Sequence, residues 1–119
     1  MYYNRNPYDI HTQDCVCRAI STATGLKYEA VNNLLDLTAE ENDCEKLCLC
    51  CYENLLTGTL CYHCQQCDFK HTVAEIAERY PRNKLIIRIK GHLTCSIFGT
   101  ILDIWDCYDE LVDCYWIVD

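Results

Sequence analysis

At 119 residues, half of them hydrophobic and 24% charged, the chain has the size and balance of one globular domain spanning residues 1–119. Eighteen acidic against ten basic residues give a net charge of −8, which argues against nucleic acid or an anionic membrane as the partner, because both are bound through Lys and Arg. The first residues lack the apolar core of a secretion signal, and no apolar run reaches the roughly 20 residues of a membrane span. We therefore expect a cytoplasmic protein, in which thiols stay reduced.

The first half of the chain is predicted to be helical. Asp14 is a good N-cap, apolar residues follow at helical spacing, and Gly25 ends the run. A second helix is predicted over residues 28–37. Residues 38–58 are predicted to form a third helix, ended by Gly58, with one stripe on its apolar face: Cys44, Leu47, Cys48, Cys51 and Leu55. Residues 59–70 show no clear period and are expected to be irregular.

The second half begins with a short helix and then changes to strands. Thr72 and Glu75 form a capping-box pattern before an apolar face, and Pro81 closes that helix. "KLIIRIK" is predicted to be a strand, "HLTCSIFGTILDIWD" a hairpin turning at Phe98 and Gly99, and "CYWIV" a last strand. Helices followed by strands predict an α+β fold, with N-terminal helices packed on a C-terminal antiparallel β-sheet.

Among the 12 cysteines, Cys15 has a distinctive position. It comes directly after the predicted N-cap, in the first turn of a helix, where the partial positive charge of the helix end stabilises a thiolate. Cys17 lies roughly 200° further around the helix and would not share a site with it. Because cysteines are also among the most frequently buried residues, a structural role for Cys15 is the alternative.

A nucleophilic cysteine needs a base and a group that orients the base. Of the four histidines, His92 follows a glycine at the start of a predicted strand, where its side chain would project into a cleft. A hairpin turning at Phe98 and Gly99 would place Asp106 at the strand end beside His92, and Asp103 on the same face as His92. Strand periodicity favours Asp103 and proximity to the strand end favours Asp106, so the pattern leaves both open.

The segments "DCVCRAISTATGLKYEAV" and "GHLTCSIFGTILDIWDC" and the terminal "YW" resemble a group of small phage-encoded and bacterial papain-like cysteine peptidase homologues. They are also similar to the peptidase domain of bacteriocin-processing ABC transporters. The resemblance spans both ends of the chain, whereas the cysteine-rich part, at about 44–67, matches loosely and is interpreted as an insert. It implies a papain-like fold in which Cys15 is the nucleophile, His92 the base and Asp106 the orienting carboxylate.

The resemblance also implies an amide before the nucleophile that stabilises the oxyanion. Position 9 holds an aspartate here, and Gln13 is the nearest amide, so Gln13 is expected to act with the backbone N–H of Cys15. The implied function is a cysteine hydrolase of peptidase or isopeptidase type that acts on a protein or peptide, is encoded by a phage or mobile element and requires no cofactor for catalysis. One alternative is an inactive papain-like protein that binds a host protein. Another is a structural zinc-binding module.

Seven cysteines lie between positions 44 and 67. Short-spaced cysteine pairs supply the four tetrahedral ligands that zinc prefers. The candidate ligands for a structural zinc ion are Cys48, Cys51, Cys61, Cys64 and Cys67. The alternative is that the cysteines of the predicted helix line its core face.

Overall fold

The computed structural model describes residues 15–103 and 107–118, and it has four α-helices, one π-helical turn and a five-stranded antiparallel sheet. The helical elements are α1 (Cys15–Thr24), α2 (Tyr28–Asn42), α3 (Leu49–Glu53), the π-helix η1 (Asn54–Thr59) and α4 (Val73–Arg79). The strands are β1 (His63–Gln66), β2 (Lys84–Ile89), β3 (His92–Ile97), β4 (Thr100–Ile101) and β5 (Val112–Ile117). The predicted α+β class is confirmed.

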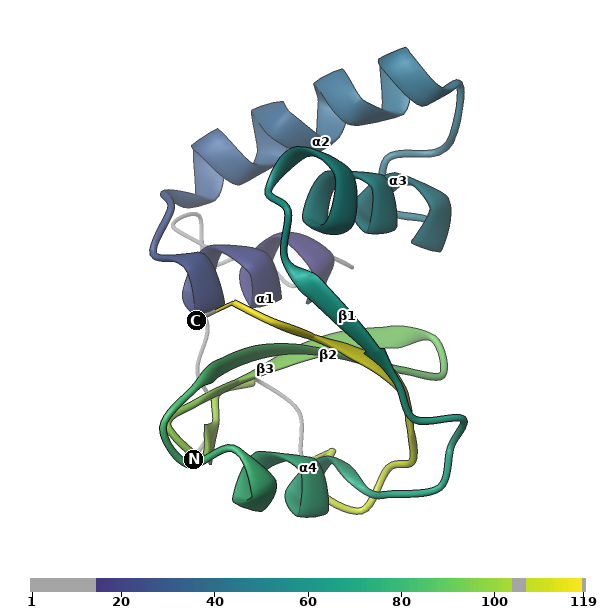
Figure 1. The fold of residues 1–119 in the computed structure, drawn as a ribbon. Coiled ribbons are helices and arrows are strands. Elements are labelled where there is room, and N and C mark those ends of the chain that lie inside the picture. Colours follow the sequence, from purple (N-terminus) through teal and green to yellow (C-terminus); the bar gives the residue numbers. More distant parts are fainter. Residues whose placement is uncertain (1–14, 104–106, 119) are drawn as a thin grey trace.

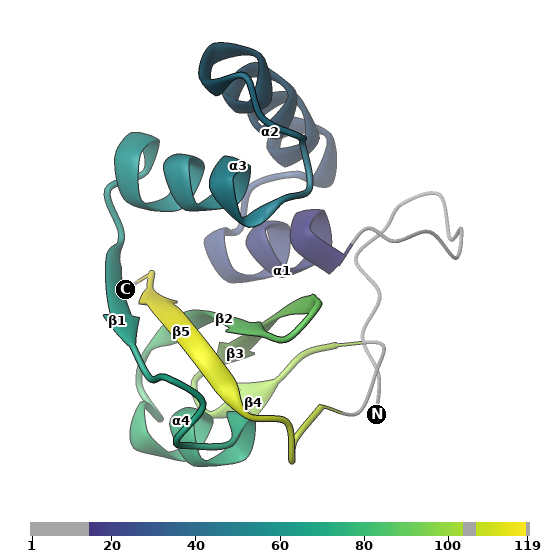
Figure 2. The same ribbon diagram turned by 90° about the vertical axis from the view of Figure 1, so that its right-hand side faces the viewer.

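The sheet has the strand order β1-β5-β2-β3-β4 and separates two layers of helices. Helices α1, α2 and α3 lie on one side of the sheet and α4 lies on the other (Figure 1). Each layer has its own hydrophobic core: the upper core lies between the sheet and α1 to α3, and the lower core lies between the sheet and α4. A view turned by 90° shows α1 lying directly over the sheet, with α2 further out (Figure 2).

Helix α1 begins at Cys15 and ends where Gly25 takes a φ of 80°, with the Gly25 N–H donating to the Ser21 carbonyl at 3.0 Å. Its apolar side is buried against β3, with Ile20 and Ala23 fully inaccessible. Asp14 lies outside the described residues.

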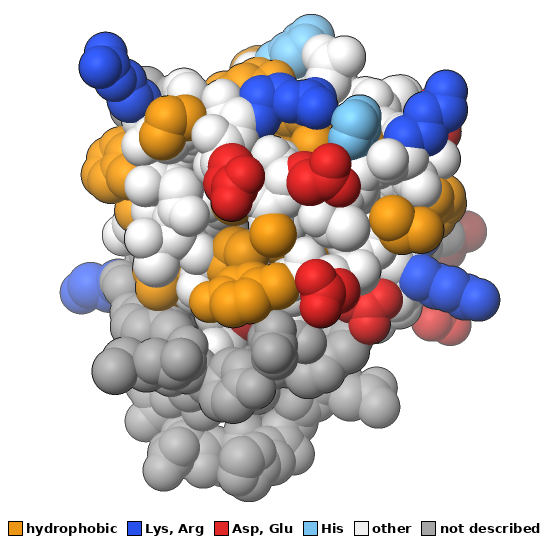
Figure 3. All heavy atoms as spheres, turned by 90° about the horizontal axis from the view of Figure 1, so that it is seen from below, with side chains coloured by type: hydrophobic (Ala, Val, Ile, Leu, Met, Phe, Trp, Pro, Cys, Tyr) orange, Lys and Arg blue, Asp and Glu red, His pale blue; other side chains and the backbone are white. Residues whose placement is uncertain are grey.

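The capping box of α4 is also confirmed. The backbone N–H of Glu75 donates to the Thr72 hydroxyl at 3.2 Å, and the Thr72 N–H donates to the Glu75 carboxylate at 2.9 Å. The space-filling view of the α4 side shows acidic and basic side chains scattered among apolar ones, so this face has charges of both signs (Figure 3).

Three sequence predictions for the middle of the chain are wrong. The second helix continues to Asn42 and ends at Asp43, which takes a left-handed φ of 51°. The predicted third helix is therefore divided: its first residues belong to α2, residues 43–48 form a non-helical connection, and the rest forms α3 and η1, with Gly58 inside the π-helical turn. Residues 63–66, expected to be irregular, form the edge strand β1 by pairing with β5.

No helix within residues 15–103 and 107–118 combines the length and the apolar character that crossing a membrane requires.

Candidate active site

The Cys15 thiol occupies the N-terminus of α1, over the start of β3. It is partly buried against the upper core, and its sulfur accepts a hydrogen bond from the backbone N–H of Leu93 and contacts the His92 ring. Cys15 is the first described residue of α1, and the N–H groups in the first turn of a helix lack intrahelical acceptors. The helix N-terminus thus presents a thiol and backbone donors together, which favours negative charge there.

His92 is placed by the turn that joins β2 to β3. Ile89 pairs with His92 across this two-residue turn, and Gly91 takes a φ of 70°, which a glycine adopts without strain. His92 is therefore the first residue of β3, beside the N-terminus of α1. The predicted position of this histidine at a strand start is confirmed.

Asp103 is placed by the β3–β4 hairpin. Phe98 and Gly99 both have positive φ, 51° and 86°, as a type I′ hairpin turn requires. Ser96 pairs with Ile101, and the Leu102 N–H donates to the Cys95 carbonyl at 3.1 Å. This register brings residue 103 opposite Thr94, on the face that carries His92.

The carboxylate that contacts His92 in the described part of the chain is Asp103. Its Oδ2 lies 2.6 Å from Nε2 of His92, and the two side chains are only 5% and 11% exposed. Nδ1 is then the ring nitrogen left for the thiol contact. Asp106, which the resemblance favours as the orienting acid, and Gln13, the expected oxyanion donor, lie outside the described residues.

The electrostatics of Cys15 and His92 favour a thiolate on the first and an imidazolium on the second. Burial alone raises the pKa of Cys15, but the hydrogen bonds from His92 and Leu93 and the charge of His92 outweigh it, so the pKa is lowered. Burial lowers the pKa of His92, but the contacts with Asp103 and Cys15 overcome this and raise it to about 9. Opposite shifts of two adjacent groups are typical of a catalytic dyad.

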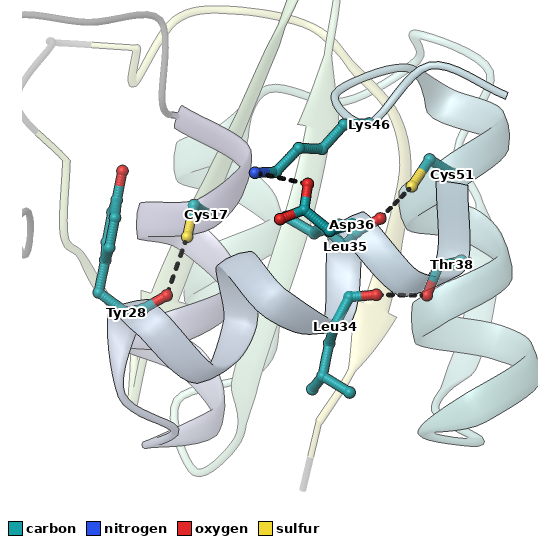
Figure 4. A network of polar contacts seen from close by, with 8 residues as sticks. All are labelled: Cys17, Tyr28, Leu34, Leu35, Asp36, Thr38, Lys46 and Cys51. Carbon is teal, nitrogen blue, oxygen red and sulfur yellow. Dashed lines mark hydrogen bonds and ion pairs between the residues drawn. The ribbon is translucent and has the colours of Figure 1, made fainter. Parts of the chain in front are cut away.

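The other cysteines contrast with Cys15. Burial raises the pKa of six of them: Cys17, Cys44, Cys51, Cys64, Cys95 and Cys114. The Cys17 thiol donates to the Tyr28 carbonyl at 3.3 Å, and the Cys51 thiol donates to the Leu35 carbonyl at 3.4 Å (Figure 4). These thiols pack against their neighbours and donate hydrogen bonds, so their role is structural.

Two further residues at the site were not singled out by sequence reasoning. Arg18, one helical turn after Cys15, is buried and interacts electrostatically with Asp103. Cys107 is buried, and its thiol lies 3.8 Å from Oδ2 of Asp103. The helical spacing between Cys15 and Arg18 is the only signal that could have indicated the first, and nothing in the sequence relates Cys107 to Asp103.

The ligand atoms of His92, Asp103 and Cys107 lie within 4.8 Å of one another, close enough for a divalent metal ion. Nitrogen, oxygen and sulfur are all ligands that zinc accepts. An ion there would replace the hydrogen bond between His92 and Asp103, so metal binding and proton transfer at His92 are competing uses of the same atoms.

The five cysteines predicted to bind zinc do not assemble. Among the described residues, no three of them form a group with sulfur atoms within 4.8 Å of one another. Cys51 lies in the upper core and Cys67 in the lower one, across the sheet. The thiols that do meet are Cys44 with Cys50 and Cys51, and Cys64 with Cys114. Zinc binding by these five cysteines stays a prediction, and the structure does not bring them together into one site.

Comparison with family models, with curated proteins and with solved structures found no match for this chain.

Proposed function

We propose that the protein is a cysteine hydrolase of peptidase or isopeptidase type, in which Cys15 is the nucleophile, His92 the general acid and base, and Asp103 the group that orients His92. The observation that carries the proposal is the position of the His92 ring, which contacts the Cys15 sulfur and the Asp103 carboxylate at once. A nucleophile that contacts a base, which is itself hydrogen-bonded to an orienting group, is the arrangement used in covalent acyl-transfer catalysis.

The chemistry follows from these three roles. His92 takes the proton of Cys15, and the thiolate attacks the carbonyl carbon of the substrate, forming a C–S bond. The backbone N–H of Cys15, at the free end of α1, donates to the oxygen that becomes negative. The imidazolium then gives its proton to the leaving amine as the C–N bond breaks. A water molecule that loses its proton to His92 attacks the thioester, releasing a carboxylic acid and restoring the thiol.

The fold supports the papain-like part of the proposal. A thiol at the start of a helix, a histidine at the start of an antiparallel strand and an acid further along the same sheet follow one another in the chain as in the peptidase homologues that the sequence resembles. The proposal gives Asp103 the orienting role that this resemblance implies for Asp106. We also propose that a phage or mobile element encodes the protein and that its substrate is a protein or peptide.

The test is alkylation of the native protein with iodoacetamide near pH 6, followed by proteolysis and mass spectrometry. Fragment ions assign the label to single cysteines, so that exposed Cys50 serves as an internal reference. We expect Cys15 to label at least about tenfold faster than Cys50, because a thiolate reacts and a thiol does not. His92→Gln should abolish the difference. Equal labelling of Cys15 and Cys50 in the unmodified protein would contradict the proposal and favour the inactive binding protein.

A further inference from the structure

A pocket of about 190 Å³ opens beside the Cys15 thiol and the His92 ring. Both side chains line it, so a group seated there is next to the atom that Cys15 attacks. Its other walls come from α1, the segment leading into α3, and the adjoining parts of β2 and β3. A cavity of about 150 Å³ holds a six-membered hydrocarbon ring, so this pocket has room for a large aliphatic side chain.

Half of the residues that line the pocket are aliphatic: Val16, Leu47, Leu49, Ile89 and Leu93. Val16 and Leu93 are buried and belong to the upper core, whereas Leu47 is 45% exposed although it is a large apolar residue. An apolar ligand in the pocket would remove Leu47 from water, which makes its burial favourable.

The polar groups of the pocket already have partners. Arg88 donates from Nε to the Tyr52 hydroxyl at 2.8 Å and from Nη1 to the Asp113 carboxylate. The Asp113 carboxylate offsets the positive charge of the guanidinium, so Arg88 provides little net attraction for an acidic group. This favours an apolar occupant over an anionic one.

The wall that carries Leu47 is held in place from both sides. The ammonium group of the preceding residue, Lys46, lies 2.9 Å from the Asp36 carboxylate of α2, and the Cys51 thiol ties α3 to α2 through the Leu35 carbonyl (Figure 4). The cysteine-rich segment thus supplies one wall of the pocket.

We infer that this pocket sets the specificity of the enzyme, and that it selects substrates with a large aliphatic side chain next to the carbonyl that Cys15 attacks. Leu47 is the specificity-determining residue at its rim. The inference rests on the proposed function and adds the substrate class to it.

The experiment measures how fast Cys15 is alkylated by three maleimides, which carry N-methyl, N-cyclohexyl and N-(2-carboxyethyl) groups. Each Cys15 rate is divided by the Cys50 rate in the same sample, which removes differences in intrinsic reactivity. We expect the ratio for the cyclohexyl probe to exceed that for the methyl probe roughly tenfold, the effect of about two buried CH₂ groups. A carboxyethyl probe that is faster than the cyclohexyl probe would overturn the inference and assign the pocket to an anionic group that binds Arg88.

A matched pair of variants tests whether Leu47 causes the preference for the cyclohexyl probe. Leu47→Asn should reduce the cyclohexyl preference severalfold, whereas Leu37→Asn should leave it unchanged, since Leu37 is 52% exposed on α2 and does not line the pocket. Both leucines are exposed, so neither substitution removes core packing. If Cys15 reacts rapidly with all three probes at equal relative rates, the pocket inference fails and the proposed function stands. If Cys15 reacts no faster than Cys50 with any probe, the proposed function fails.

Discussion

Nε2 of His92 lies 2.6 Å from Oδ2 of Asp103, a residue eleven positions later that reaches the histidine across the β3–β4 hairpin. Both side chains are nearly buried, and a charge-assisted hydrogen bond gains strength where water is excluded. This contact fixes the orientation of the ring, and through the ring it acts on the Cys15 thiol.

Replacing Asp103 by Asn tests this contact directly. An amide is uncharged, so the pKa of His92 should fall and the thiolate should lose its positive partner. We expect the alkylation rate of Cys15 at pH 6 to drop at least about tenfold, which corresponds to one pKa unit. Asp106→Asn is the comparison variant, because Asp106 is the acid that the resemblance favours. Loss of reactivity in Asp106→Asn alone would assign the orienting role to Asp106.

The pH dependence should report the two shifted pKa values. Because the pKa of Cys15 is lowered, its alkylation rate should be maintained below the ordinary range of thiols and decline only as pH falls through the lowered value. Release of the amine also needs the protonated ring, so hydrolysis of a peptide substrate should decline again as pH rises through about 9, the pKa of His92. A hydrolysis rate that rises steadily to pH 11 would be incompatible with an imidazolium as proton donor.

Cys15 and Cys17 should respond differently to substitution. Cys17→Ser places a more polar group in a site that is 2% exposed. It should lower the free energy of unfolding by about 1–2 kcal/mol while leaving the alkylation of Cys15 intact. Cys15→Ala should abolish labelling at that position with little loss of stability. Urea denaturation monitored by circular dichroism, together with the mass-spectrometric assay, measures both effects.

The hairpin turn that sets the register of Asp103 can be tested at Gly99. Its φ of 86° disfavours any side chain, although the space around it is sufficient. Gly99→Ala should therefore destabilise the protein by about 1 kcal/mol or more. Gly58→Ala is the matched control, because Gly58 lies in the π-helical turn with an ordinary φ and open space. Equal losses in both variants would show that the strained turn is not the cause.

Metal removal distinguishes two roles of His92, proton transfer and metal binding. The proposed reaction uses only the thiol, the imidazole and the carboxylate, so dialysis against EDTA should leave the alkylation rate of Cys15 unchanged. A zinc ion held by His92, Asp103 and Cys107 would interrupt the contact between the ring and Asp103. A several-fold increase in Cys15 reactivity after EDTA treatment would therefore show that the purified protein had carried an inhibitory metal.

Local signals in the sequence were sufficient to predict several helices and their ends. Gly25 ends α1 because the left-handed conformation suits glycine, and the Thr72–Glu75 pair caps α4 through contacts within four residues. Local signals failed where longer-range contacts decide. Strand β1 has no alternation of its own and forms because β5 offers it a partner. The predicted third helix is interrupted at Asp43, which no periodicity indicates.

The sequence alone placed the candidate nucleophile at a helix start and the candidate base at a strand start, because both positions follow from capping and turn residues next to them. It could not choose between Asp103 and Asp106. Periodicity says which face a residue occupies in a strand, but the regular strand β4 ends at Ile101, and only the folded chain decides which acid then meets the histidine. Tertiary structure also determined the contacts of Arg18 and Cys107 with Asp103, and the pocket, because packing brings together residues that are far apart in the chain.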